Sequence, residues 1–368
     1  MNPTWPEWLP LREDLRSLTP YGAPQVDSQA RLNTNENPYP PSPALIAAIT
    51  SRVEEVSSSL NRYPDRDAWQ LRTGLAEYLN ERSSQSFKAE QIWAANGSNE
   101  IIQSIFLAFG RQKALGFTPS YSMHPLIAKV TGTPWVSGLR RDDFSIDIAL
   151  ACEQVLSEKP ELIFLTTPNN PSGTSISLPD IETLAQAAQS VGGLLVIDEA
   201  YAEFSTEPSA VTLLATFPNL VVIRTMSKAF AFAGVRLGYM AANAIVVDAI
   251  QLVRLPYHLS ALTQAVALVA LDFRDELLES VEMLIKAREK MVLELGNLGA
   301  RVIPSSANFL LFTVPSSHTS WEVWQSLLDQ GVLIRDVGLS GYLRVTIGTD
   351  DENEQFLNAL RKSLGGSK

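Results

Sequence analysis

A series of short apolar runs, separated by stretches of helical composition, constrains the fold of this chain more than any other feature. Several of these runs lead into a loop and then a helical stretch. Near-continuous apolar strands that alternate with helices are typical of a mostly parallel sheet covered by helices on both faces. The sequence therefore predicts an α/β protein. The predicted strands cover residues 92–95, 113–117, 134–138, 161–166, 193–198 and 220–224.

The chain before this series has a different composition. Residues 1–45 are rich in proline, which predicts an extended arm with at most a short helix. Two helices are expected next, at about 42–55 and 69–80, the second with leucines at fourfold spacing. A third helix is expected at about 99–109.

The composition changes again from Pro256 onward. Ser260 can cap a long helix that runs to about Leu295 and links two domains. We therefore predict a large domain over residues 46–258 and a smaller α+β domain over 259–368, which the arm joins. The small domain is expected to contain strands at 301–303, 308–314, 332–335 and 342–347, and a terminal helix at about 351–364.

Charge and composition exclude several classes of function. The formal net charge of −11 and the pI near 4.9 argue against a nucleic-acid partner, because phosphate backbones are bound by basic surfaces. Three histidines and the single Cys152 provide no metal-binding cluster and no internal disulfide. No run approaches the roughly 18 apolar residues of a membrane-spanning helix, and no basic segment leads into an apolar one at the start. We therefore expect a cytoplasmic protein without membrane or metal partners.

The segment from Val222 to Met240 joins an apolar strand to a lysine. The strand passes through Thr225 and Ser227 to Lys228, and Arg236 follows eight residues later. Hydroxyls, a lysine and an arginine suit a phosphate-bearing aldehyde, because the lysine can form an imine while the other groups bind the phosphate dianion. The alternative is an ordinary loop lysine after a strand.

Polar groups at the ends of other strands converge on the same place. Asn170 follows the strand at 161–166 and can hydrogen-bond a phenolic oxygen, as can Tyr201. Asp198 ends an apolar run, where a carboxylate is costly unless it meets a cation such as a protonated pyridine nitrogen. Tyr121 offers a plane for ring stacking. Each residue alone also fits a turn, a cap or a core position.

A possible anion site precedes the helix at about 99–109. The sequence Asn96-Gly97-Ser98-Asn99-Glu100 places a glycine and free backbone N–H groups at the helix start. The first N–H groups of a helix have no intrahelical partner, and the helix dipole favours negative charge there.

These motifs resemble those of the pyridoxal-phosphate-dependent enzymes of the aspartate aminotransferase fold (fold type I), and within them the histidinol-phosphate aminotransferases. The resemblance extends over essentially the whole chain. It implies a homodimeric enzyme of histidine biosynthesis with pyridoxal 5'-phosphate as cofactor. The matching motifs are Asn35-Glu36-Asn37-Pro38, Arg62-Tyr63-Pro64-Asp65, Asn170-Pro171-Ser172-Gly173, Asp198-Glu199-Ala200-Tyr201, Ser227-Lys228-Ala229-Phe230, Gly234-Val235-Arg236-Leu237-Gly238 and Leu343-Arg344-Val345.

The resemblance also implies a role for each matching residue. Lys228 would carry the cofactor covalently, and Asp198 would pair with its ring nitrogen. Asn170 and Tyr201 would bind the ring oxygen and Tyr121 would stack on the ring. The phosphate would be bound by Thr225, Ser227, Arg236, Ser98 and Asn99.

Other residues would bind substrate or complete the site from a second subunit. Tyr63 would reach the phosphate of the neighbouring subunit of a homodimer. Asn37, Arg335 and Arg344 would bind substrate, because planar guanidinium groups bind carboxylate or phosphate in a bidentate way. His124 lies near Tyr121 in sequence, where it either touches substrate or is a neutral histidine at a helix start.

The implied reaction is reversible transfer of an amino group between L-histidinol phosphate and 2-oxoglutarate, giving imidazole-acetol phosphate and L-glutamate. A threonine-phosphate decarboxylase or an aromatic aminotransferase on the same fold is the nearest alternative. A regulatory protein that binds the cofactor without turnover is a different class, and it would normally carry an added basic DNA-binding domain.

Overall fold

Seven strands form the central sheet in the computed structural model, which describes residues 5–20 and 22–365. Four of the six strand pairings are parallel, and only β8 runs against its neighbours. This arrangement confirms the predicted mostly parallel sheet. In order across the sheet the strands are β2 (Ile92–Ala95), β8 (Gly238–Ala242), β7 (Leu220–Thr225), β6 (Leu194–Asp198), β5 (Leu162–Thr166), β3 (Ala114–Thr118) and β4 (Trp135–Leu139).

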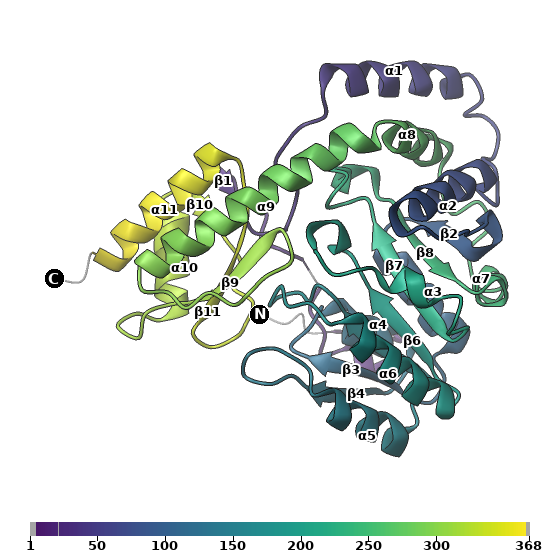
Figure 1. Cartoon of the computed structure of the whole chain (residues 1–368), viewed down its shortest axis with the longest axis horizontal. Coiled ribbons are helices and arrows are strands. Elements are labelled where there is room, and N and C mark those ends of the chain that lie inside the picture. The colour runs from purple at the N-terminus through teal and green to yellow at the C-terminus, as the bar shows by residue number, and fades with distance from the viewer. Residues whose placement is uncertain (1–4, 21, 366–368) are drawn as a thin grey trace.

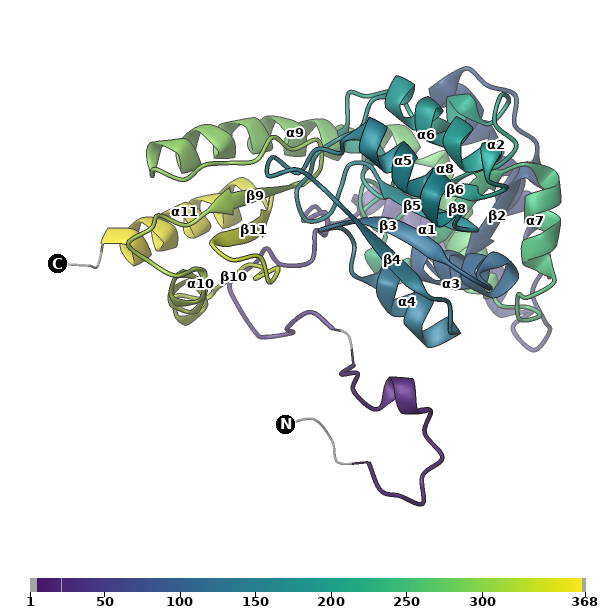
Figure 2. The ribbon, with the colours of Figure 1, turned by 90° about the horizontal axis from the view of Figure 1, so that it is seen from below.

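Helices cover both faces of this sheet (Figures 1 and 2). Most of them begin at a residue whose side chain caps the helix, such as Ser42 before α1 and Ser177 before α6. The helices of this larger part are α1 (Pro43–Ser57), α2 (Trp69–Ser83), α3 (Ser98–Phe109), α4 (Met123–Thr131), α5 (Ile148–Glu158), α6 (Leu178–Ser190), α7 (Ala244–Gln251) and α8 (Ala261–Asp272).

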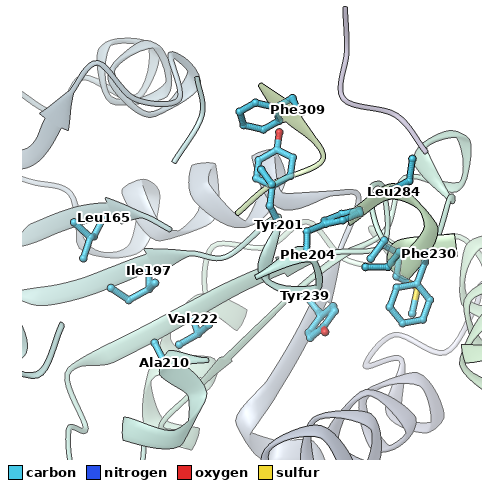
Figure 3. Close-up of a cluster of buried hydrophobic side chains, with 14 of the residues drawn as sticks. Leu165, Ile197, Tyr201, Phe204, Ala210, Val222, Phe230, Tyr239, Leu284 and Phe309 are labelled. Carbon is cyan, nitrogen blue, oxygen red and sulfur yellow. The ribbon is translucent and has the colours of Figure 1, made fainter. Parts of the chain in front are cut away.

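Two apolar cores lie on the opposite faces of the sheet, because successive strand residues point in opposite directions. On β6, Leu195 and Ile197 belong to the core that contains residues of α2, α5, α6 and α8. Val196, between them, belongs to the core that contains residues of α3, α4 and α7. Figure 3 shows part of the first core, where Leu165, Ile197 and Val222 come from neighbouring strands. Burial on both faces explains why the strands lack a polar alternation.

A smaller part contains the C-terminal region (Figure 1). Strands β9 (Phe309–Thr313) and β11 (Tyr342–Thr346) pair in antiparallel fashion. The short β1 (Ala30–Arg31) pairs in parallel with β10 (Val332–Leu333), so the arm before α1 is hydrogen-bonded to the C-terminal region. The helices here are α9 (Arg274–Asn297), α10 (Ser320–Asp329) and α11 (Asp350–Gly365). The exact limits of the predicted domains stay a prediction.

Three sequence-based expectations differ from the structure. The predicted single helix from Ser260 to Leu295 is two helices, α8 and α9, which meet at Phe273. The predicted strand at 301–303 is a single bridge between Val302 and Phe312. Strand β8 was not predicted. Three of its five residues are glycine or alanine, which have low strand propensity, and pairing with β7 and β2 makes this segment a strand.

The N-terminal arm runs outside the main body over much of its length (Figure 2). Its regular structure before α1 consists of a short 3₁₀ turn at Glu13–Leu15 and β1. Arg12 donates hydrogen bonds to the carbonyl oxygens of Lys129 and Val130 at the end of α4. Among the residues that the structure describes, no helix combines the length and apolarity needed to cross a bilayer.

Candidate active site

A cavity of about 340 Å³ lies at the carboxyl ends of the parallel strands. The last residues of β5, β6 and β7, Thr166, Asp198 and Thr225, all line it. Open α/β sheets form their sites at this edge. Residues of the arm and of the C-terminal region close the cavity from the other side: Ala23, Asn33, Thr34, Asn35, Glu36, Arg335 and Arg344.

Lys228 lies in this cavity, three residues after the end of β7. Its Nζ donates a hydrogen bond to the backbone carbonyl oxygen of Thr34, at 2.8 Å. Burial, followed by the positive charge of Arg344, lowers the pKa of Lys228 to about 8, although Glu36 acts in the opposite direction. The lowered pKa increases the fraction of neutral amine near physiological pH, which suits Lys228 to act as a nucleophile or a base.

Ser98, at the first turn of α3, faces the β7–β8 connection across a narrow gap. Gly97 has φ +85°, and a Cβ there would lie 2.6 Å from Nη2 of Arg236. A Cβ on Gly238 would lie 2.4 Å from the backbone nitrogen of Ser98. Glycine is thus required at both positions. The first N–H groups of α3, the Ser227 hydroxyl and the exposed Arg236 guanidinium lie together as a cradle that could hold a phosphate dianion.

Asp198 is buried with a histidine at its side. Its Oδ2 lies 3.1 Å from Nε2 of His124, and both side chains are only 2% exposed. His124 belongs to the first turn of α4 and stands edge-on to Tyr121, which lines the cavity. His124 itself does not line this cavity, so it contacts the carboxylate and not the space beside Lys228.

Arg335 and Arg344 are placed side by side by a β-bridge. The backbone N–H of each donates to the carbonyl oxygen of the other, at 3.0 and 2.9 Å. Residues directly opposite in such a pair project to the same face, and both guanidinium groups line the cavity. Arg344 Nη1 donates to Oδ1 of Asn170, which orients the Asn170 amide so that its NH₂ group points away from the arginine.

Tyr201 and Tyr121 both line the cavity. The Tyr121 hydroxyl donates to Oδ1 of Asn99, at 3.1 Å. The Tyr201 hydroxyl accepts a hydrogen bond from Nδ2 of Asn35, at 2.9 Å. Nearly all of the residues predicted for the site are therefore brought together around one cavity.

Two predicted residues are not part of this cavity. Tyr63 is 79% exposed and stacks on Tyr257, with ring centroids 4.3 Å apart. The Asn37 amide donates to Ser280 and to the carbonyl oxygen of Ala229, and its oxygen accepts from Tyr39 N–H. Asn37 lines a second cavity and not the one that contains Lys228, so its contacts give no support to the predicted substrate-binding role.

The sequence analysis missed the wall formed by Asn33, Thr34 and Asn35. The sequence assigns these three residues no role, although Asn35 belongs to the motif Asn35-Glu36-Asn37-Pro38. The available signal was an uninterrupted run of polar residues, from Asn33 to Asn37, within a proline-rich arm. A polar run that is buried must have hydrogen-bonding partners, and here the partners are Tyr201, Lys228 and Arg344.

This set of groups fits a phosphate-bearing pyridine aldehyde. The phosphate cradle, Lys228 with its lowered pKa, the buried Asp198 carboxylate and the amide of Asn170 provide a partner for each polar group of such a molecule. In the part of the chain that the structure describes, no group of three or more His, Cys, Asp or Glu side chains is placed to hold a metal ion.

Comparison with known proteins agrees with this geometry. The family profile described as "Aminotransferase class I and II" matches residues 27–360. The histidinol-phosphate aminotransferase of Thermobifida fusca is 55% identical over 361 residues, which cover 97% of this chain and 96% of that protein. The enzyme of the same name from Mycolicibacterium smegmatis is 54% identical over 360 residues, covering 97% and 94%.

Solved structures show the same fold. The crystal structure of the histidinol-phosphate aminotransferase from Clostridium acetobutylicum has a TM-score of 0.82 at 25% identity and covers 92% of this chain and 99% of that one. The Sinorhizobium meliloti enzyme, solved in complex with pyridoxal-5'-phosphate, has a TM-score of 0.86 at 23% identity and covers 98% of each chain. The chain therefore belongs to the class I and II aminotransferases, in the family of the histidinol-phosphate aminotransferases.

Proposed function

We propose that this protein is a pyridoxal-phosphate-dependent aminotransferase that moves an amino group reversibly between L-histidinol phosphate and 2-oxoglutarate. The products are imidazole-acetol phosphate and L-glutamate, and the reaction belongs to histidine biosynthesis in the cytoplasm. One observation carries the proposal: a lysine with a lowered pKa shares a cavity with a phosphate cradle, a buried aspartate and two adjacent arginines. The identity of more than 50% to histidinol-phosphate aminotransferases over nearly the whole chain supports the choice of substrate.

The residues that would hold the cofactor follow from the site. Ser98, Asn99, Thr225, Ser227 and Arg236, which all line the cavity, would bind the phosphate. Asp198 would pair with the ring nitrogen, Asn170 and Tyr201 with the ring oxygen, and Tyr121 would stack on the ring. When bound, the cofactor supplies an aldehyde that accepts the amino group and a protonated ring that withdraws electrons.

Lys228 has two tasks in this proposal. Its Nζ is the nucleophile for the aldehyde, and after release it moves a proton as base and then acid. Neutral amine is needed for both, and the lowered pKa provides it. His124 holds the Asp198 carboxylate by the contact at 3.1 Å, which fixes the direction in which the carboxylate faces the cavity.

The two arginines would bind the anionic end of each substrate in turn. One substrate carries a phosphate ester and the other carries carboxylates, and a planar guanidinium group binds both types of anion in a bidentate way. Arg344 is buried and fixed by Asn170 and the backbone of Asn33, whereas Arg335 is half-buried. We therefore assign the common anion contact to Arg344.

A homodimer completes the proposal. Tyr63 and Tyr257 stack on the surface, where several large apolar side chains are exposed, among them Leu252, Leu255 and Trp69. An exposed apolar surface of this kind is typical of a protein interface. Tyr63 would reach the phosphate cradle of the neighbouring subunit.

The test is a screen of half-reactions with the cofactor-loaded protein, in which the visible absorbance reports conversion. L-Histidinol phosphate should convert the absorbance faster than aromatic amino acids, and 2-oxoglutarate should restore it. The Lys228→Ala variant should fold, bind the cofactor and lose turnover by at least about 1,000-fold. Release of carbon dioxide from threonine phosphate would identify a decarboxylase, and preference for an aromatic amino acid would identify an aromatic aminotransferase.

A further inference from the structure

Asn35 occupies an unusual position in the arm. It is 1% exposed and has φ +55°, in the left-handed region that asparagine tolerates better than most residues. Its backbone N–H donates to Oγ1 of Thr346 on β11, at 3.0 Å, and its carbonyl oxygen accepts from Nδ2 of Asn308, at 3.1 Å. The C-terminal region thus holds this backbone in place.

The side chain of Asn35 connects the same region to the cavity. Oγ1 of Thr346 donates to Oδ1 of Asn35, at 3.2 Å, and Nδ2 of Asn35 donates to the hydroxyl oxygen of Tyr201, at 2.9 Å. All three side chains are buried. Tyr201 is packed edge-on against Phe309 of β9, with ring centroids 5.1 Å apart (Figure 3).

Each hydrogen bond in this chain has a defined donor and acceptor. The Thr346 hydroxyl already accepts from the Asn35 backbone, and its single proton goes to Asn35 Oδ1. The amide oxygen is therefore on the Thr346 side, and only the NH₂ group is available to Tyr201. A phenol that accepts from an NH₂ group keeps its own proton for donation elsewhere, and Tyr201 lines the cavity.

We propose that Asn35 is a positioning residue, which turns the Tyr201 hydroxyl so that it donates its proton to the ring oxygen of the bound cofactor. The relay runs in one direction, from Thr346 through Asn35 to Tyr201. This inference rests on the proposed function, because it assigns the ring oxygen to the space beside Tyr201. Under this inference Asn35 of the arm and Thr346 of the C-terminal region both influence the charge on the ring oxygen of the cofactor.

The consequence concerns a proton shared by the Lys228 nitrogen and the ring oxygen. A donor to the ring oxygen stabilises its anionic form, so the shared proton is lost at lower pH. If the Tyr201 proton is drawn away, the ring oxygen becomes more basic and the proton is held more tightly. The pH at which the visible absorbance of the loaded protein titrates should then rise.

Asn35→Asp inverts the relay with almost no change of shape, because a carboxylate only accepts and would take the Tyr201 proton. The added negative charge by itself also raises the pH at which the absorbance titrates. Asn35→Asp is therefore made both in the protein with Tyr201 and in the Tyr201→Phe variant. The shift caused by Asn35→Asp should be larger by about one pH unit when the phenol is present. Equal shifts with and without the phenol would overturn the inference.

Thr346→Val removes the hydroxyl that fixes the amide, whereas the matched Thr346→Ser keeps it. Thr346→Val should raise the pH at which the visible absorbance titrates, and Thr346→Ser should leave it unchanged. Asn35→Gly suits the left-handed backbone and removes only the side chain, so it serves if Asn35→Asp fails to fold. A folded Asn35→Gly protein that titrates like the wild type, together with an unchanged Thr346→Val protein, would overturn the inference.

Cofactor affinity measured by equilibrium dialysis provides a second readout that does not depend on turnover. It should weaken in Asn35→Asp and in Thr346→Val but not in Thr346→Ser. A wild-type protein that binds no cofactor would overturn the proposed function and this inference together. Normal binding by the wild type, with variants that neither titrate nor bind differently, would overturn this inference alone.

Discussion

Lys228 is held in surroundings that favour its neutral form, and this has a consequence for stability. Its folded pKa is about 8, whereas an unfolded lysine has a pKa near 10.4. Between these values the unfolded chain binds more protons at this site, so the stability of the cofactor-free protein should rise with pH. The destabilising effect of the charged lysine is fully present below about pH 8.

Lys228→Met tests this pH dependence directly. The variant should be more stable than the cofactor-free wild type at pH 7, and the difference should shrink as the pH rises from about 8 to about 10. Urea unfolding at several pH values is the measurement. The exposed Lys290 on α9 is the control, and Lys290→Met should show no such trend. A difference that stays constant with pH would contradict the assignment.

Arg344 is expected to serve both half-reactions. Loss of this buried, charge-assisted contact in Arg344→Ala should cost roughly 2–5 kcal/mol, or about 30-fold to several thousandfold in catalytic efficiency, with either substrate. Arg344→Lys should recover only part of this, because an ammonium group lacks the planar fork. Stopped-flow measurement of each half-reaction is the test, with Arg301→Ala, an exposed arginine of the same region, as the control.

A variant that is slowed with histidinol phosphate and unaffected with 2-oxoglutarate would show that the two substrates do not share Arg344. The anion contact would then fall to Arg335, its partner across the β-bridge. Arg335→Ala distinguishes the two cases in the same experiment.

Many residues of the site could be predicted because their chemistry is local. Asp198 ends an apolar strand, Lys228 and Asn170 each follow one, and the ends of parallel strands meet at one edge of a sheet. Asn35 could not be placed in this way. Its role depends on Thr346 and Tyr201, which are distant in sequence, and a lone asparagine in an arm is most often a turn residue.

At the scale of elements, a buried ion cluster joins the end of β6 to β7. Arg224 Nε donates to Glu199 and Nη1 donates to Glu203, both at 2.8 Å. Burial alone would lower the pKa of Arg224, but the two carboxylates raise it above its usual value. Glu199 follows Asp198 directly, and Arg224 lies four residues before Lys228. The cluster thus fixes the two strand ends that carry the reacting groups.

Arg224→Met should destabilise the protein by about 3–5 kcal/mol, because it leaves two buried carboxylates without their cation. Adding Glu199→Gln to that variant should recover part of the loss. The control is Arg361→Met, which breaks a partly exposed pair with Glu294 and should cost less than about 1 kcal/mol. Urea midpoints of the four proteins give the comparison. Equal losses for Arg224→Met and Arg361→Met would show that the cluster contributes little.

Elements defined by distant pairing escaped the sequence analysis. The parallel strands were found within a residue or two, because their apolar composition is sufficient to identify them. Strand β8 lacks that composition and depends on β2 and β7 on either side. The end of α8 at Phe273 carries neither glycine nor proline, so the boundary between α8 and α9 is set by packing and not by a local stop signal.

At the scale of the whole molecule, the proposed homodimer predicts sites built from two subunits. Tyr63→Ala and Lys228→Ala proteins should each have low activity. After mixing and subunit exchange, one of the two sites in every mixed dimer regains both intact residues, so activity should return. The readout is turnover together with a direct measure of exchange, such as differently labelled subunits. If subunits exchange and activity does not return, Tyr63 does not act across the interface.

The pairing of β1 with β10 has a consequence for folding during synthesis, because the two strands are far apart in the sequence. Ala30 is synthesised first and Val332 about 300 residues later, which at roughly 5–20 residues per second is a delay of about 15–60 s. During that time the arm has no partner strand, and its many prolines keep it from pairing with others. Thr34 and Asn35, which line the cavity, also lack their C-terminal partners until Thr346 has been synthesised. A chain that ends before β11 would therefore contain Lys228 but lack part of the cavity wall around it. We expect the active site to be complete only when the C-terminal region has been synthesised.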